Sequence, residues 1–254
     1  MKISPFSQGD KNFDVLAKIR ADSIFSGYDF YNNVFCNNEI IFSNFKKMIK
    51  KYKNKKIMII GGGPSTNELL SNNYREVFDE YDFLWSCNSF FLNPILKDVK
   101  MDMAMMMLDP DLESQEFKSY CMTHKPLIGF ELHKKWKEKK IDYEDLFMMQ
   151  TRFYGVLGSC QRMLIFACFL RAKEIGFVGL DGLTSMKKGV HSFKEKSVAL
   201  REMPSITDEE PFQYQYDVFW DYVNSNFKKS RLINYGHDNS YHRQLTKRVN
   251  YEKR

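Results

Sequence analysis

The sequence lacks the features that would assign it at once to a membrane, secreted or repeat class. No apolar run approaches the ~18 residues that a membrane span needs, and the first residues do not have the pattern of a signal peptide. No internal repeat is visible. Hydrophobic residues make up 43% of the 254-residue chain and charged residues 28%, so we expect a folded chain rather than a disordered one.

Cysteine is scarce and arranged in no recognisable framework. The chain has five cysteines, an odd number, and no two of them have CxxC spacing. A disulfide scaffold and a zinc ribbon are therefore disfavoured, and we expect reduced thiols in a cytoplasmic protein. The five are Cys36, Cys87, Cys121, Cys160 and Cys168.

The net charge is mildly positive. Lys and Arg number 38 against 32 Asp and Glu, which gives 38 − 32 = +6. This balance favours an anionic ligand or surface, but no single basic stripe predicts a nucleic-acid partner. The lysine-rich run 46–56 is typical of a solvated helix face and linker, and the basic tail 243–254 of a solvated terminus. Either could instead contact anionic lipid, which would put the protein at the periphery of the inner membrane.

Short apolar runs alternate with segments of helical length, which predicts an α/β fold. A Rossmann-like, doubly wound and mostly parallel sheet is expected at 57–236, after a helical extension at 1–56 and before a basic tail at 237–254. The stretch 159–172 is apolar most of the way round and should form a buried helix. The predicted strands are 57–60, 83–87, 103–108, 126–130, 175–179 and 232–235, with an aromatic helix near 211–229.

The first predicted strand ends in a glycine turn, which is the main candidate for an anion site. Ligands of parallel sheets bind beyond the carboxyl ends of the strands. Consecutive glycines let a backbone approach a phosphate, and the N–H groups that open the next helix would point at it. A tight turn that binds nothing is the alternative. The turn comprises Gly61, Gly62 and Gly63, followed by Pro64 at the expected helix start and by Ser65.

Two common nucleotide motifs do not fit this turn. The P-loop lysine is absent after Pro64, and the second strand ends at Asn88 rather than at the acidic residue of a dinucleotide site. Dinucleotide and S-adenosylmethionine sites are thus disfavoured. The Asn88 amide can donate and accept hydrogen bonds at once, which suits a ribose or a base edge, although it could equally cap a helix.

The order of several short motifs resembles one enzyme family. Gly61–Ser65 is followed by Cys-Asn-Ser-Phe-Phe at 87–91, by Gly-Ser at 158–159 opening an apolar helix, by a strand ending at Asp181, and by His191-Ser192. This order resembles the bacterial sialyltransferases of glycosyltransferase family 42. It also resembles a wider group with the motility accessory factors and the 6-hydroxymethylpterin pyrophosphokinase-like proteins.

The resemblance implies a fold and a set of roles. It implies a Rossmann-like, metal-independent transferase that binds a CMP-linked sialic or nonulosonic acid and a surface-glycan or lipid-linked acceptor, as in lipopolysaccharide or capsule assembly. Homo-oligomers would be compatible with it. By this resemblance His191 would be the general base, and the donor-binding residues would be Gly61, Gly62, Gly63, Pro64, Ser65, Asn88, Asp109, Gly158, Ser159 and Asp181.

The sequence also departs from the family. Two tyrosines that bind the leaving phosphate are missing, since residues 183–186 read Leu-Thr-Ser-Met, and an expected Asn-Pro is Asp109-Pro110. Asp109 and Asp181 could instead hold Mg²⁺ in a phosphotransferase, or Asp109-Pro110 could be a plain turn. A non-catalytic nucleotide-binding protein of a glycan pathway is the third alternative. His237 and His242 are spaced oddly for a metal, and a loop or helix cap is expected there.

Overall fold

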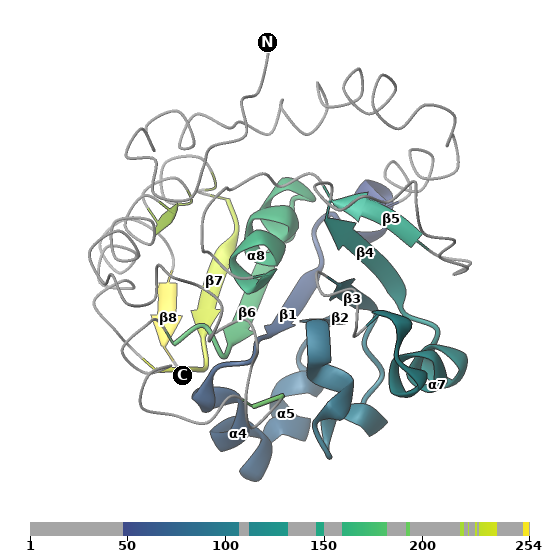
Figure 1. Cartoon of the computed structure of the whole chain (residues 1–254). Helices are drawn as coiled ribbons and strands as arrows, with labels where there is room; N and C mark the ends of the chain where they lie inside the picture. Colours follow the sequence, from purple (N-terminus) through teal and green to yellow (C-terminus); the bar gives the residue numbers. More distant parts are fainter. Residues whose placement is uncertain are drawn as a thin grey trace, which may run out of the picture.

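A computed structural model describes most of the predicted sheet and the helices around it. The described residues are 48–106, 112–131, 146–149, 159–181, 192–193, 219–220, 223, 227, 229–237 and 251–253. Figure 1 shows strands side by side across the centre of the molecule, with α8 lying over β6 and β1. Within these residues, no helix has the length and apolar character needed to cross a membrane.

The described strands form an eight-stranded sheet in which every neighbouring pair is parallel. The strand order is β5-β4-β3-β2-β1-β6-β7-β8. Strands β2 to β5 are thus added in sequence order on one side of β1, and β6 to β8 are added on its other side. The predicted α/β, doubly wound fold is therefore confirmed. The strands are β1 Lys56–Ile60, β2 Phe83–Cys87, β3 Met103–Met106, β4 Leu127–Glu131, β5 Leu146–Met149, β6 Glu174–Val178, β7 Arg231–Asn234 and β8 Tyr251–Lys253.

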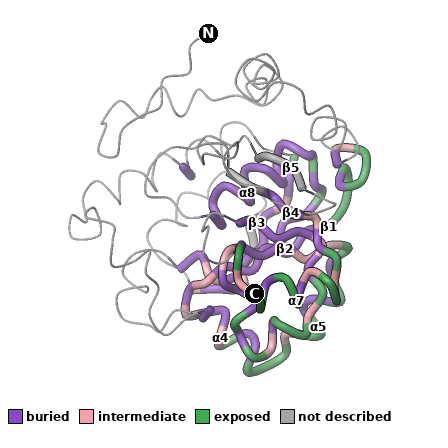
Figure 2. Tube along the Cα trace, turned by 45° about the vertical axis from the view of Figure 1, so that its right-hand side comes forward, coloured by how far each residue is buried: buried purple, intermediate pink, exposed green. Residues whose placement is uncertain are grey.

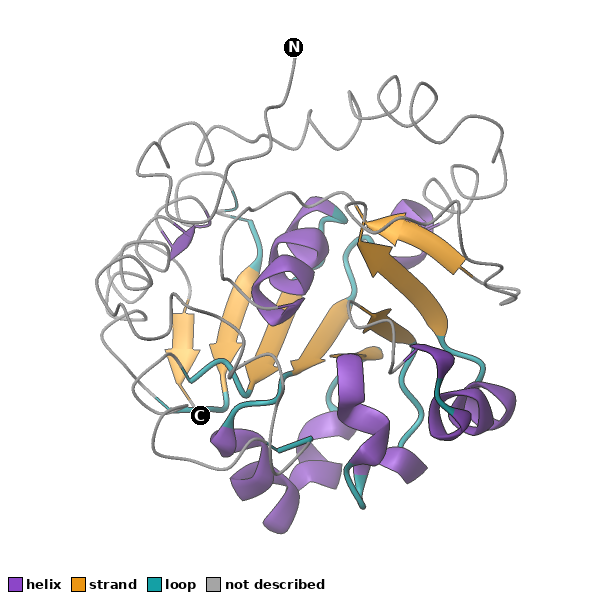
Figure 3. Cartoon of the chain, in the orientation of Figure 1, coloured by secondary structure: helices purple, strands orange, loops and turns teal. Residues whose placement is uncertain are grey.

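Helices cover this sheet, as Figure 3 shows. Because crossovers between parallel strands are right-handed, the helices after β1 and before β6 lie on opposite faces. The predicted buried helix is α8, and all of its residues are buried. The helical elements are α4 Pro64–Ser71, α5 Tyr74–Asp79, η1 Asn88–Leu92, η2 Leu96–Asp98, α7 Gln115–His124 and α8 Ser159–Phe169.

The core lies between the sheet and its helices, and most residues of the central strands are buried (Figure 2). The central strands are apolar on both faces because helices cover both, as expected of a parallel sheet. Helical residues 48–52 add to this core: Tyr52 is fully buried, and its ring meets the rings of Phe83 and Trp85 edge-on, with centroids 4.7 and 5.1 Å away. The second half of the lysine-rich run thus anchors to the sheet while its lysines stay mostly exposed.

The sheet extends beyond the strands that the sequence predicted. β5 and β8 were not predicted, and β8 lies within the stretch 237–254 assigned to a basic tail. Residues 1–47 of the predicted extension and most of the predicted helix near 211–229 lie outside the described residues.

Candidate functional site at the carboxyl edge of the sheet

The glycine turn packs against the turn that follows β6. The N–H of Gly61 donates to the carbonyl of Val178 at 2.9 Å, and the N–H of Gly63 donates to that of Gly179 at 3.1 Å. A Cβ on Gly61 would lie 2.8 Å from the Gly179 carbonyl oxygen, and Gly179 itself has φ +74°. The glycines therefore allow two backbone turns to meet at the switch point between β1 and β6.

Asp181 caps the helix that begins at this turn. Its carboxylate accepts the N–H of Ser65 at 2.9 Å and the Ser65 hydroxyl at 2.5 Å, and the N–H of His237 reaches it at 3.2 Å. Asp181 is 1% exposed. A carboxylate at a helix N-terminus is stabilised by the free N–H groups and by the helix dipole. The side chain predicted to bind a donor or Mg²⁺ thus holds the end of β6 and the chain after β7 to the start of α4.

A fourth hydrogen bond completes this network. The Ser65 hydroxyl, while donating to Asp181, accepts the N–H of Gly179 at 3.0 Å. Next to it, the Thr66 hydroxyl donates to the carbonyl of Gly61 at 2.7 Å. The first turn of α4 is therefore rigidly fixed to the edge of the sheet.

Two of the predicted donor-binding residues meet at the same edge. Asn88 directly follows β2, and its side-chain amide donates to the hydroxyl of Ser159, the first residue of α8, at 3.1 Å. Asn88 has φ 51°, a left-handed conformation that asparagine tolerates better than most residues. The pair places an amide and a hydroxyl at the N-terminus of an 11-residue helix, where the dipole favours an anion.

Ser192 fastens a distant part of the chain to the glycine turn. Its hydroxyl donates to the carbonyl of Gly63 at 2.6 Å and its N–H to the carbonyl of Gly62 at 2.9 Å. The Asn93 amide, just after η1, donates to the Ser192 carbonyl at 2.8 Å. Residues 192–193 are thereby held between the turns that follow β1 and β2.

His237 makes a second link to α4. Its Nε2 lies 2.9 Å from the carboxylate oxygens of Glu68, while its backbone N–H is the one that reaches Asp181. His237 lies in a loop, as expected, and His242 lies outside the described residues. Three further predicted site residues, Asp109, Gly158 and His191, lie outside the described residues.

Two thiols lie beneath this edge. Cys87 and Cys160 are buried, with their sulfur atoms 3.9 Å apart. The hydrogen bond to Cys87 raises the pKa of the Cys160 thiol, and burial raises it further. Among the described residues, no group of three or more His, Cys, Asp or Glu side chains is arranged to hold a metal ion.

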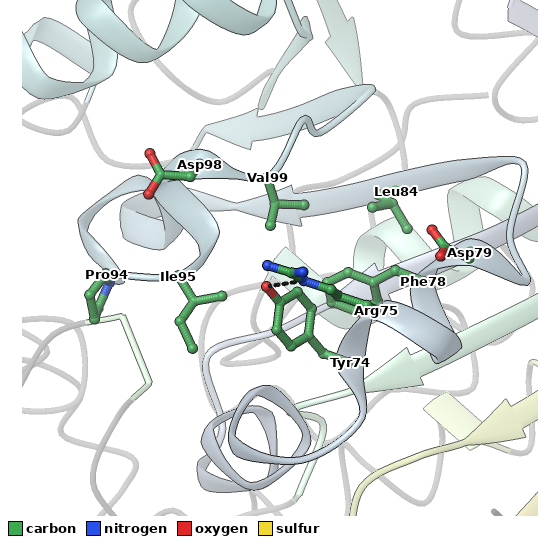
Figure 4. Close-up of a pocket in the computed structure, with 9 residues that line it drawn as sticks. All are labelled: Tyr74, Arg75, Phe78, Asp79, Leu84, Pro94, Ile95, Asp98 and Val99. Atoms are coloured by element: carbon green, nitrogen blue, oxygen red, sulfur yellow. Dashed lines mark hydrogen bonds between the residues drawn. The ribbon is translucent and has the colours of Figure 1, made fainter.

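A separate hollow of about 450 Å³ opens beside α5 (Figure 4). The apolar side chains of Phe78, Leu84 and Ile95 line it together with Arg75, whose Nε–H donates to the Tyr74 hydroxyl at 3.2 Å. Leu84 lies in the first half of β2, away from the carboxyl edge. The hollow is thus distinct from the edge where Asn88 and the glycine turn lie.

Sequence reasoning missed several residues that build this edge. Asn93, Glu68 and the contacts of Ser192 gave no signal, because their partners are distant in sequence. The thiol pair did leave a signal in the sequence, because Cys87 and Cys160 each adjoin a residue that was predicted to bind the donor.

The chain matches no family model and no curated protein at a significant level. Thirteen chains of solved structures do match. One is the sialyltransferase CST-II with a Tyr-to-Phe substitution, in complex with CMP, at 16% identity and a TM-score of 0.48 over 71% of this chain and 80% of that one. Another is the MAf glycosyltransferase from Magnetospirillum magneticum AMB-1, at 9% identity and a TM-score of 0.46; it is matched over 80% of this chain but only 34% of its own length.

A sialyltransferase and a further glycosyltransferase are thus among the solved structures to which this chain is similar. At these identities the similarity concerns the fold, and it assigns no substrate and no residue role.

Proposed function

We propose that the chain is a glycosyltransferase that transfers a sugar from a nucleotide-activated donor. A CMP-linked sialic or related nonulosonic acid is the donor to test first, with a surface glycan or its lipid-linked precursor as acceptor. The observation that carries the proposal is the attachment of Ser192 to the carbonyl groups of Gly62 and Gly63. It connects the segment that follows His191 to the glycine turn, and so supports a base at the donor edge.

The donor would bind along the carboxyl edge near Asn88 and Ser159. The Asn88 amide suits a nucleotide ribose or base edge, and the N-terminus of α8 suits a phosphate or carboxylate. Departure of CMP places new negative charge on its phosphate, which a fixed helix N-terminus stabilises without reorganising. The glycine turn would let the donor approach its backbone closely. The N–H groups of Gly61 and Gly63 would not bind the donor, because they already donate to the carbonyls of Val178 and Gly179.

The proposed chemistry needs one proton transfer. His191 would accept the proton of the acceptor hydroxyl as that oxygen attacks the anomeric carbon and the bond to the CMP phosphate breaks. A histidine with a near-neutral pKa is suited to this step. No metal is required in this scheme. A role for Asp181 in holding Mg²⁺, the phosphotransferase alternative, would require its carboxylate to give up hydrogen bonds to Ser65.

The place of action and the assembly state belong to the same proposal. An enzyme that receives a cytoplasmic nucleotide sugar would act on the cytoplasmic side, and the basic segments would allow peripheral contact with an anionic inner membrane. A homo-oligomer is compatible with this arrangement.

The proposal is tested with the His191→Ala variant. Removing a general base lowers turnover by about 10²-fold or more while donor binding is retained. CMP affinity and the transfer rate from CMP-sialic acid to a lactose-terminated acceptor are measured in EDTA and in Mg²⁺. Normal turnover in the variant would overturn the role of His191, and activity only with Mg²⁺ and a triphosphate would favour the phosphotransferase.

A further inference from the structure

The two buried thiols join the elements that carry the candidate donor site. Cys87 is the last residue of β2 and Cys160 is the second residue of α8, and their sulfurs are 3.9 Å apart. The residues beside them, Asn88 and Ser159, hydrogen-bond to each other at 3.1 Å. The thiol contact and the amide–hydroxyl contact therefore lie one residue apart and both link the carboxyl end of β2 to the start of α8.

The Cys160 thiol also touches the glycine turn. A Cβ on Gly61 would lie 2.5 Å from its sulfur, and the backbone of Gly62 hydrogen-bonds to it. Three segments of the candidate site, the ends of β1 and β2 and the start of α8, thus meet at this one sulfur atom. A displacement of the sulfur will therefore shift atoms in all three segments, because a close-packed interior transmits strain.

We propose that Cys87 and Cys160 are an oxidisable pair, closed to a disulfide by a hydroperoxide, and that this bond weakens nucleotide binding at the carboxyl edge. The first half of the proposal stands on the thiol geometry alone. The second half rests on the proposed function.

The chemistry balances in two steps. The Cys87 sulfur attacks the peroxide and becomes a sulfenic acid, releasing one water from hydrogen peroxide; the Cys160 sulfur then attacks it, loses its proton and releases a second water. The sulfurs must close from 3.9 Å to about 2.05 Å. The hydrogen bond to Cys87 and burial raise the pKa of the Cys160 thiol, which makes it the poorer first nucleophile, and we therefore place it in the second, resolving step.

Closure of the bond alters the site in a definite way. Drawing the sulfurs together changes the contact of Cys160 with the backbone of Gly62 and the spacing between the neighbouring residues Asn88 and Ser159. The spacing of the groups proposed to hold the nucleotide then changes. We expect the oxidised protein to bind CMP at least fivefold more weakly than the reduced protein, and dithiothreitol to restore the affinity.

The first readout is the cross-link itself. The full chain is treated with hydrogen peroxide, remaining thiols are alkylated under denaturing conditions, and peptides are mapped by mass spectrometry without reduction. The expected product is a peptide pair joined at Cys87 and Cys160, absent from Cys87→Ser and Cys160→Ser. The control is Cys121→Ser, on the surface helix α7, which should still form the bond. Recovery of both thiols in alkylated form, or their separate oxidation to sulfinic acid, would overturn the proposal.

The second readout is CMP affinity before and after oxidation. Equal affinity in a cross-linked sample would overturn the coupling to the site. A reduced protein that binds no CMP would instead contradict the proposed function, and the cross-link map would still decide whether the thiols are a redox pair.

Discussion

Ser65→Ala tests whether the buried network around Asp181 fixes α4 to the sheet. The substitution removes a hydroxyl that donates to the Asp181 carboxylate at 2.5 Å and accepts the N–H of Gly179 at 3.0 Å. A buried hydrogen bond to a charged group contributes about 1.5–3 kcal/mol, and the orphaned N–H of the half-buried Gly179 adds about 1 kcal/mol. We expect a loss of about 3 kcal/mol in the free energy of unfolding, which lowers Tm by about 6–12 °C in a chain of this size.

The matched control lies on the same helix. Ser71 is exposed, and its hydroxyl donates only to the carbonyl of Asn67 one turn earlier. Ser71→Ala should therefore change the stability by no more than about 0.5 kcal/mol. Urea unfolding followed by circular dichroism measures both variants. A Ser65→Ala protein within about 1 kcal/mol of wild type would refute the reasoning, since a buried acceptor and a backbone donor would then have lost a partner at no cost.

Two further substitutions test buried contacts, one at the segment before β3 and one at the glycine turn. Tyr120→Phe removes a hydroxyl that receives the N–H of Met101 at 2.8 Å and donates to the carbonyl of Val99 at 2.7 Å, so we expect a loss of about 2 kcal/mol in urea unfolding; an unchanged midpoint would contradict this. Gly61→Ala places a methyl group 2.8 Å from the Gly179 carbonyl oxygen, and we expect a loss of about 3 kcal/mol or more, or failure to fold. A soluble alanine variant as stable as wild type would show that the two turns can separate freely.

The central strands were predictable because a strand that is buried on both faces is a short run of apolar residues, which is visible in the local sequence. The run 57–60 is continuously apolar and the run 83–87 is apolar except for Ser86, and the structure has strands at both. The apolar stretch from Ser159 likewise became the buried helix α8. β8 was not predictable in this way: it has three residues, two of them charged, and it belongs to the sheet only through its pairing with β7.

The site was predictable in position but not in detail. Strand ends identified Asn88 and Asp181, because parallel strands bring their carboxyl ends to one edge. Nothing local shows that Asp181 caps a helix 116 residues earlier in the chain, or that Ser192 docks on a carbonyl 129 residues away. Such contacts depend on how the crossovers order the strands in the sheet. The separation of two residues in the sequence does not show whether they meet in space.

The most direct test of the proposed function is a thermal-shift titration with CMP in EDTA, on wild type and on Asn88→Gly. Glycine adopts the left-handed conformation of Asn88 without strain, so the variant removes the amide and leaves the backbone in place. The control is Asn72→Gly, at an exposed asparagine whose side chain donates to the carbonyl of Glu68.

At 100 times its Kd, CMP should stabilise wild type by about 2.7 kcal/mol, or about 5–11 °C in Tm. The account predicts this shift in wild type and in Asn72→Gly, and its loss in Asn88→Gly. Equal shifts in all three proteins would contradict the placement of the donor at Asn88, and no shift with CMP in wild type would contradict the CMP-linked donor itself.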